Sequence, residues 1–380
     1  MNGHARFMHN ADMDGRQTMK TLEYSLRFNT PAFLGNAEQQ GQWRTPPIKA
    51  LLRQWWRVAW AADHGFRVDV AAMRREEGQL FGVASDGDGN SRRSLVRMRL
   101  GDWRMGQLRV WAGPDSPVSH PEVKNRDGRQ TPVGSQLYLG YGPLVFRQGT
   151  ALKANAAIQA GEAATLAIAF PTTHSGAELR RLLEANAPRL QHALRLMDRY
   201  GTLGGRSRNG WGSLALLAAP TGSDGATQAA PAPLRPWRDC LGTDWPHAIG
   251  RDERPLIWQT PPFSDWKALM RRLAEIKIGL RTQFAFTTGR NARQVEPRHW
   301  LSYPVTNHSV VAWGNNARLP NTLRFKVRAT ADQRLVGVIF HVPHLPPAAF
   351  RPDPRAIENV WAQVHRFLDA PAQQLTRIPE

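Results

Sequence analysis

The segment 201–212 reads GTLGGRSRNGWG, and five of its twelve residues are glycine. Glycine lets the main chain come close to a ligand, and free backbone N–H groups beside arginines suit a row of phosphates. Trp211 offers a ring on which a base can stack. We therefore predict that this loop contacts a nucleic acid. Its candidate RNA-binding residues are Gly204, Gly205, Arg206, Ser207, Arg208, Asn209, Gly210 and Trp211.

The neighbours of the loop exclude two mononucleotide motifs. A dinucleotide-binding fingerprint needs a strand before its glycines and a helix after them, whereas here a helical pattern precedes the loop and a strand pattern follows it. A Walker A loop needs Gly-Lys-Ser/Thr, which this segment lacks. The alternative to a binding loop is an ordinary helix-to-strand turn, but such a turn needs only one or two glycines.

A second basic feature lies on the predicted helix 45–65. Lys49, Arg53 and Arg57 share one face at i, i+4 and i+8, with no acidic residue between Lys49 and Arg57. The alternative is an ordinary solvated face. Trp55 is expected in the core and Trp56 toward a partner. The further candidate RNA-binding residues are Thr30, Gly35 and Asn36 in the preceding loop, Arg44, Lys49, Arg53, Trp56 and Arg57 at this helix, and Arg318, Arg324 and Lys326 in the second half.

The composition supports a polyanionic partner. The chain has 380 residues, 50 Lys and Arg against 31 Asp and Glu, and a formal net charge of +19. Such an excess favours nucleic-acid binding, although an arginine-rich genome is an alternative. The single cysteine, Cys240, excludes an internal disulfide and indicates the reducing cytoplasm. No apolar run predicts a membrane span, and the polar start is not a secretory signal.

Hydrophobic periodicity divides the first half into strands and helices. Apart from the helix 45–65, it predicts a second helix over 176–201, whose core face repeats leucine at helical spacing. It also predicts a hairpin tip over 84–93 and a long polar loop over 113–134. Strands are predicted within 22–35, 79–85, 94–100, 107–113, 135–142, 164–170 and 213–220. The order is a βαββαβ plan with inserted strands.

The same signals recur after a linker-like segment over 219–236. A strand at 255–260, a helix at 264–281, a hairpin at 322–343 and a helix at 355–368 predict a second, similar module. We therefore expect an α+β fold of two ferredoxin-like (RRM-like) domains with inserted hairpins and loops. The expected organisation is a disordered extension over 1–18, a first domain over 19–218, a linker or insertion over 219–250 and a second domain over 251–380.

The glycine loop resembles that of the RAMP superfamily of CRISPR-associated proteins. The pairing of FNTPAFLGNA (28–37) with WRTPPIKALLRQWWRVAW (43–60), together with RLPNTLRFKV (318–327), is similar to the RAMP subunit numbered first in the type III-B (Cmr) effector complex. The resemblance implies binding of crRNA or target RNA toward the 3′ end of the guide, and assembly with other RAMP subunits in antiviral defence. It also implies a non-catalytic role, with no cofactor.

An alternative function is a metal-independent endoribonuclease that processes CRISPR repeat RNA, with His64 as general base. RAMP backbone subunits that cut target RNA use an aspartate in a loop of the first domain, but residues 29–44 contain Glu38 and no aspartate. His341 and His344 fall on opposite faces of a strand pattern, which disfavours a metal site. We therefore expect no catalytic residue and no metal.

Overall fold

The structure is a computed structural model that describes residues 18–84, 91–154, 156–173, 176–218 and 232–379. Residues 1–17 of the expected N-terminal extension, most of the expected hairpin tip and residues 219–231 of the expected linker lie outside the described residues. The predicted mixture of helices and sheets is confirmed. In the described part of the chain, no helix is long and apolar enough to span a membrane.

The first half forms a four-stranded antiparallel sheet in the order β2-β7-β1-β8. Without the inserted elements, its chain order is strand, helix, strand, strand, helix, strand. The elements of this half are β1 (Met19–Phe28), α1 (Thr45–Asp63), α2 (Val70–Phe81), β2 (Arg97–Leu100), β3 (Pro117–Val118), β4 (Val133–Gly134), α3 (Ser135–Gly140), β5 (Leu144–Phe146), β6 (Thr150–Leu152), β7 (Ala163–Pro171), α4 (Ala177–Tyr200) and β8 (Leu214–Ala218).

The second half repeats this plan. Its main sheet is antiparallel in the order β12-β13-β11-β14, so its first, second, third and fourth strands take the same places as β1, β2, β7 and β8. The elements are β9 (Leu234–Pro236), β10 (Ile249–Arg251), β11 (Ile257–Gln259), α5 (Trp266–Thr282), β12 (Leu323–Ala329), β13 (Leu335–His341), α6 (Pro354–Asp369) and β14 (Thr376–Arg377). Short 3-10 helices are η1 (Asp239–Gly242), η2 (Pro297–Trp300), η3 (Ala348–Phe350) and η4 (Pro371–Gln373).

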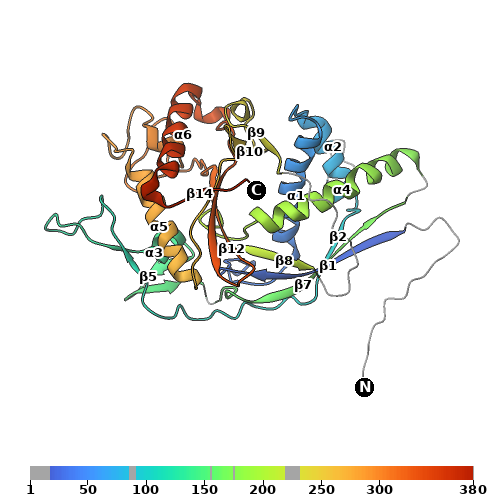
Figure 1. The fold of residues 1–380 in the computed structure, drawn as a ribbon, viewed down its shortest axis with the longest axis horizontal. Coiled ribbons are helices and arrows are strands. Elements are labelled where there is room, and N and C mark those ends of the chain that lie inside the picture. The colour runs from blue at the N-terminus through green and yellow to red at the C-terminus, as the bar shows by residue number, and fades with distance from the viewer. Residues whose placement is uncertain (1–17, 85–90, 155, 174–175, 219–231, 380) are drawn as a thin grey trace, which may run out of the picture.

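The two halves share a core, and their sheets and helices alternate in layers (Figure 1). Helices α1 and α4 cover the first sheet on one side and meet the second sheet on the other, where Trp55 and Tyr200 contact Phe340 of β13. Helices α5 and α6 cover the opposite face of the second sheet. The second sheet is therefore buried between helices of both halves.

Two predicted strands are helical instead. Residues 79–85 contain the end of α2, and residues 135–142 contain α3. Short apolar runs do not distinguish a strand from a buried helical turn. Helix α2 lacks a clear apolar stripe because its buried face includes a carboxylate, Glu77, which is 3% exposed. The predicted strand at 107–113 forms only an isolated bridge, Leu108 with Ala157.

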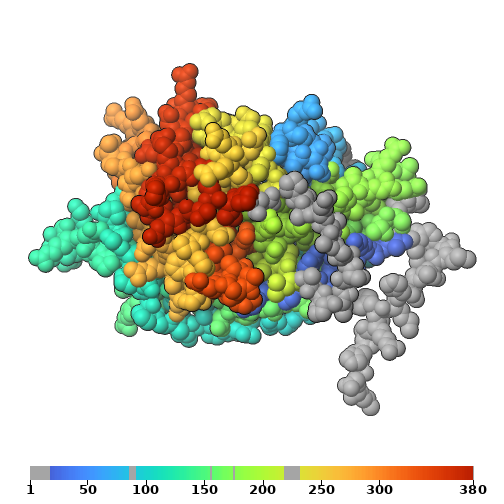
Figure 2. All heavy atoms as spheres, in the orientation of Figure 1, coloured from blue at the N-terminus to red at the C-terminus, as the bar shows by residue number. Residues whose placement is uncertain are grey.

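Two segments expected to be loops or linkers carry local structure. In the polar segment 113–134, β3 pairs with β4, and the residues between them project from the body at the left of Figure 2. Residues 232–250, expected as linker or insertion, contain β9, η1 and the start of β10. Trp237 and Cys240 are buried there, so this part packs onto the second half.

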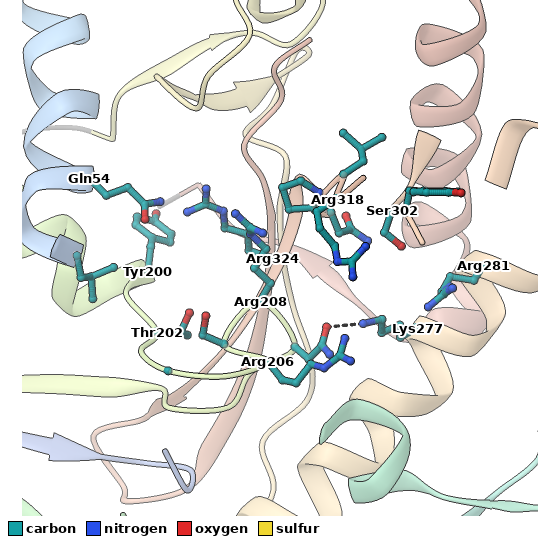
Figure 3. Close-up of a pocket in the computed structure, with 18 of the residues that line it drawn as sticks. Gln54, Tyr200, Thr202, Arg206, Arg208, Lys277, Arg281, Ser302, Arg318 and Arg324 are labelled. Carbon is teal, nitrogen blue, oxygen red and sulfur yellow. Dashed lines mark hydrogen bonds between the residues drawn. The ribbon is translucent and has the colours of Figure 1, made fainter. Parts of the chain in front are cut away.

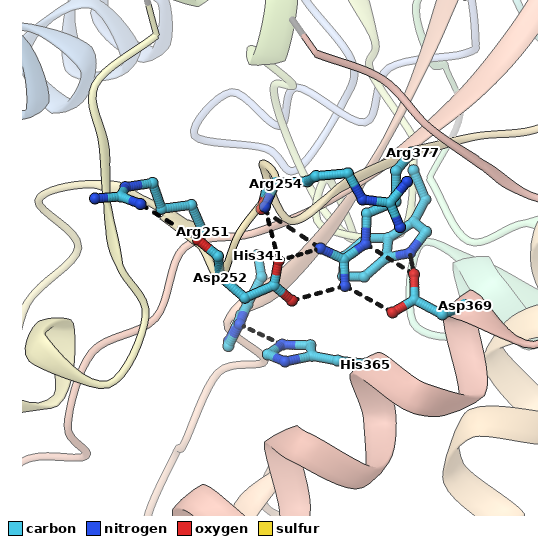
Figure 4. A network of polar contacts seen from close by, with 8 residues as sticks. Arg251, Asp252, Arg254, His341, His365, Asp369 and Arg377 are labelled. Carbon is cyan, nitrogen blue, oxygen red and sulfur yellow. Dashed lines mark hydrogen bonds and ion pairs between the residues drawn. The ribbon is translucent and has the colours of Figure 1, made fainter.

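A buried polar network lies in the second half (Figure 4). His341 of β13 contacts the Thr322 hydroxyl through Nε2 at 2.9 Å, and its Nδ1 lies 3.0 Å from Nε2 of His365 on α6. Nearby, Arg377 forms ion pairs with Asp252 and Asp369, each at 2.6 Å. These contacts join the strand β14 to α6 and to the turn after β10.

Candidate nucleic-acid interface

The glycine loop joins α4 to β8, and its two ends are buried while Gly204, Arg206 and Arg208 are exposed. A Cβ at Gly212 would lie 1.9 Å from the carbonyl oxygen of Leu203, and one at Gly204 would lie 2.6 Å from that of Phe33. Both glycines have a positive φ, +62° and +93°, which other residues adopt only at a cost. These glycines are required by the close packing of the loop.

The loop also runs along β12, the edge strand of the second sheet. The N–H of Phe325 donates to the Arg208 carbonyl at 3.0 Å, and the N–H of Val327 donates to the Ser213 hydroxyl at 2.8 Å. This pairing covers an edge that would otherwise expose free hydrogen-bonding groups. The loop is thus a joint between the two halves, and its backbone is held on both sides.

Beside the joint lies a cleft of about 690 Å³, which residues of both halves line (Figure 3). Six cationic side chains line this cationic cleft, and no carboxylate of the described residues does. None of the six forms an ion pair within the described part of the chain. They are Arg206 and Arg208 of the loop, Lys277 and Arg281 of α5, Arg318, and Arg324 of β12.

Arg324 is the most buried of these cations, with 7% of its surface exposed. The alternation of β12 turns Leu323, Phe325 and Val327 toward α5 and α6, so Arg324 lies on the opposite face, beside Gln54 of α1. Burial, together with the charge of Arg208, lowers the pKa of Arg324 to about 9. A buried guanidinium without a carboxylate is costly, and an anion in the cleft would relieve that cost.

The cleft brings together seven of the predicted binding residues. They are Gly204, Arg206, Ser207, Arg208, Asn209, Arg318 and Arg324. The position of the Arg206 guanidinium is fixed by a hydrogen bond, which its Nε donates to the Tyr141 carbonyl at 2.5 Å. Gly35 and Gly205 line a different hollow of about 600 Å³ on the other side of the loop.

The basic stripe on α1 faces another helix. Both Arg53 and Arg57 pair with Glu77 of α2 at 2.9 Å, and Lys49 donates to the Phe81 carbonyl at 2.9 Å. Sequence reading took part of α2 for a strand and so missed this acidic partner. The stripe is therefore paired within the protein, with Arg53 and Arg57 still partly exposed, and its contact with RNA stays a prediction.

Two tryptophans expected to face a partner are buried, so that expectation is wrong. Trp56 is 0% exposed and donates its indole N–H to Asn186 of α4 at 2.8 Å. Trp211 is 0% exposed and packs edge-on against Trp111 and Trp266. An exposed ring does lie beside the loop, since Tyr141, whose carbonyl holds Arg206, is 64% exposed.

The remaining predicted residues have internal partners or local positions. Thr30 is buried and donates to the Gly210 carbonyl at 2.7 Å, and neither residue lines the cleft. Asn36 accepts N–H groups of its own turn, and Arg44 is the N-cap residue of α1. Lys326 is 0% exposed and binds the Asp198 carbonyl at the end of α4, so the expectation that it extends a basic surface is wrong.

Sequence analysis missed Lys277, Arg281 and Gln54. Lys277 and Arg281 lie one turn apart on α5, and the apolar periodicity that predicts this helix says nothing about its polar face. His64, the candidate general base, stacks on Trp60 at the C-terminal end of α1. It lies ten residues beyond Gln54, or about 15 Å along the helix axis. No histidine of the described residues lines the cleft.

The protein is thus a chain of mixed helices and sheets, with two halves of the same strand order and a cationic cleft at their joint. Among solved structures it is similar to Cmr1 from Pyrococcus furiosus in its apo form, with 15% identity, a TM-score of 0.39, and coverage of 86% of this chain and 90% of that one. It is also similar to a chain of the type III-B Cmr-beta complex bound to cognate target RNA, with 10% identity, a TM-score of 0.47, and coverage of 90% and 99%.

A third match is a chain of the type III-B Cmr-beta complex bound to cognate target RNA and AMPPnP in the presence of ssDNA. It has 10% identity and a TM-score of 0.45, and the match covers 91% of this chain and 98% of that one. Cmr chains are the group that the sequence motifs resemble. No protein-family model matches the sequence. No curated protein matches it either.

Proposed function

We propose that the protein is a non-catalytic RNA-binding subunit of a type III-B CRISPR RNA-guided effector complex. Single-stranded guide or target RNA lies along the cationic cleft, toward the 3′ end of the guide, and other RAMP subunits flank the chain. The observation that carries RNA binding is the cleft itself: six cations from both halves converge there without a carboxylate of the described residues. Assignment to a CRISPR complex rests on the sequence motifs.

The cleft suits a phosphate backbone better than a small neutral ligand. Arginine binds phosphate oxygens through planar paired donors, and Arg206, Arg208 and Arg324 line one hollow with the backbone of the glycine loop. Phosphate contacts position a strand without reading its sequence. We therefore expect binding that is strong, sensitive to salt and weakly selective for sequence.

Replacing Arg206 and Arg208 together by alanine is expected to weaken binding of single-stranded RNA about 100-fold, since each charge-assisted contact contributes about 1.5 kcal/mol. The slope of log K against log salt should flatten by about 1.4, because each lost phosphate contact contributes about 0.7. Fluorescence anisotropy over a salt series measures both values. Replacing the exposed Arg355 and Arg366 of α6 removes the same charge and should leave the slope unchanged. An unchanged slope in the loop variant removes the loop from the binding site.

Tyr141 is proposed as a stacking platform beside the glycine loop, in the role first expected for Trp211. Base stacking on an aromatic ring contributes about 1–3 kcal/mol, so Tyr141→Ala should weaken RNA binding by about 5- to 100-fold. Tyr141→Phe retains the ring and should bind like the native protein. Equal weakening by both variants would show that the phenol oxygen, and not the ring, makes the contact.

The absence of catalysis has a direct test. Purified protein is incubated with labelled CRISPR repeat RNA in EDTA, and the expected result is intact RNA. Site-specific cleavage that disappears in His64→Ala would establish the endoribonuclease alternative.

We further propose that both halves are variants of the ferredoxin-like domain. Each follows the order strand, helix, strand, strand, helix, strand, and each main sheet places those strands in the order second, third, first, fourth. Internal duplication of one module explains this repetition.

A further inference from the structure

Lys277 occupies an unusual position in the cationic cleft. It lies on α5, one turn before Arg281, and its amine points toward the glycine loop (Figure 3). Its side-chain nitrogen donates to the side-chain oxygen of Asn209. Asn209 is held in turn, because its amide N–H donates to the Leu139 carbonyl at 2.7 Å. The amine therefore has a fixed, uncharged partner.

The charged groups that face this amine are all cationic. Arg281 approaches from α5 and Arg206 from the loop, while Ser302 and Tyr303 supply only neutral groups to the same cleft. No carboxylate of the described residues forms an ion pair with Lys277. Burial, reinforced by Arg281 and Arg206, lowers the pKa of Lys277 well below its ordinary value. A buried amine that lies beside two cations favours the binding of an anion next to it.

We propose that Lys277, oriented by Asn209, forms a phosphate-binding position that takes up a proton when RNA binds. The inference rests on the proposed RNA binding and specifies how one position of the cleft works. A phosphate oxygen beside the amine stabilises the ammonium form, because an opposite charge within a few ångström favours ionisation. Arginines of the cleft stay protonated at neutral pH. RNA should therefore bind more tightly as the pH falls across the range in which Lys277 titrates.

Calorimetry tests this inference. A single-stranded oligouridine is titrated into the full chain at pH 8, in HEPES and in Tris, whose different ionisation enthalpies report the number of protons exchanged. The native protein is expected to take up protons when it binds the strand. Its affinity should fall by up to about tenfold per pH unit in the titration range. Thermal melting checks that each variant is folded.

Two substitutions distinguish the effect of proton uptake at position 277 from the effect of its positive charge. Lys277→Arg keeps a cation that stays protonated, so it should bind RNA at least as tightly as the native protein at pH 8, with no proton uptake. Lys277→Gln should bind weakly at every pH. The same uptake in Lys277→Arg as in the native protein would overturn the inference.

The two proposals fail in different ways. RNA binding by the native protein without proton uptake overturns the role of Lys277 and leaves RNA binding intact. A native protein that binds no RNA, at low salt and at any pH from 6 to 8, overturns both.

Discussion

Gly212→Ala is expected to destabilise the protein by about 4 kcal/mol or more, a cost seen only where a specific mechanism operates. The added methyl group would lie 1.9 Å from the Leu203 carbonyl oxygen, well inside contact distance. Neither partner can yield freely, because the Leu203 N–H donates to the Gly212 carbonyl and the Gly212 N–H donates to the Pro31 carbonyl. The positive φ of +62° adds strain for any side chain.

Urea unfolding followed by circular dichroism measures this loss. Gly242→Ala is a matched control, since Gly242 is exposed and a Cβ there meets no atom within 4 Å. The control should lie within about 0.5 kcal/mol of the native protein. A Gly212→Ala variant as stable as the control would mean that the loop is loosely packed and that its glycines serve ligand approach instead.

Acid is expected to remove about 4 kcal/mol of folding stability between pH 7 and pH 5 through His344 and His365 alone. Burial lowers the pKa of His365 to about 3 and that of His344 to about 4, against about 6.5 in an unfolded chain. The folded state therefore binds fewer protons than the unfolded state. Stability is complete above pH 6.5 and falls by about 1.4 kcal/mol per unit and per histidine as the pH approaches the folded values.

His365 is hydrogen-bonded to His341, whereas the His344 ring contacts the Val342 carbonyl at 3.0 Å. His344→Gln should therefore reduce the difference in unfolding free energy between pH 7 and pH 5 by about 2 kcal/mol. Gly242→Ala, which changes no titratable group, should leave the difference unchanged. Equal differences in all three proteins would place the acid sensitivity elsewhere, for example in the overall positive charge.

Sequence periodicity predicted the main sheets and helices because their apolar faces repeat regularly. The strands β1, β7, β12 and β13 and the helices α1, α4, α5 and α6 all lie where it placed them. It missed α2, because a buried Glu77 stands where an apolar residue was expected. Without α2, the pairing of Arg53 and Arg57 with Glu77 could not be predicted.

Some residues of the cationic cleft could be predicted from the sequence and others could not, depending on whether they lie close together along the chain. Arg206 and Arg208 could be found because they lie within a local motif. Lys277 belongs to the same cleft, but it reaches it through the packing of α5, far along the chain. Trp211 was misread because a glycine-rich segment looks like an exposed turn. Here the end of the segment, residues 209–212, is buried, and Trp211 is buried with it.

The layered arrangement determines how the two halves would behave if they were produced as separate polypeptides. One face of the second sheet is covered by α1 and α4 of the first half, where Phe340 meets Trp55 and Tyr200. The two halves are therefore separate along the sequence, but they share one hydrophobic core. Either half produced alone would expose a broad apolar surface, which favours aggregation. Two separate polypeptides, produced together, would instead behave as complementary fragments of one molecule.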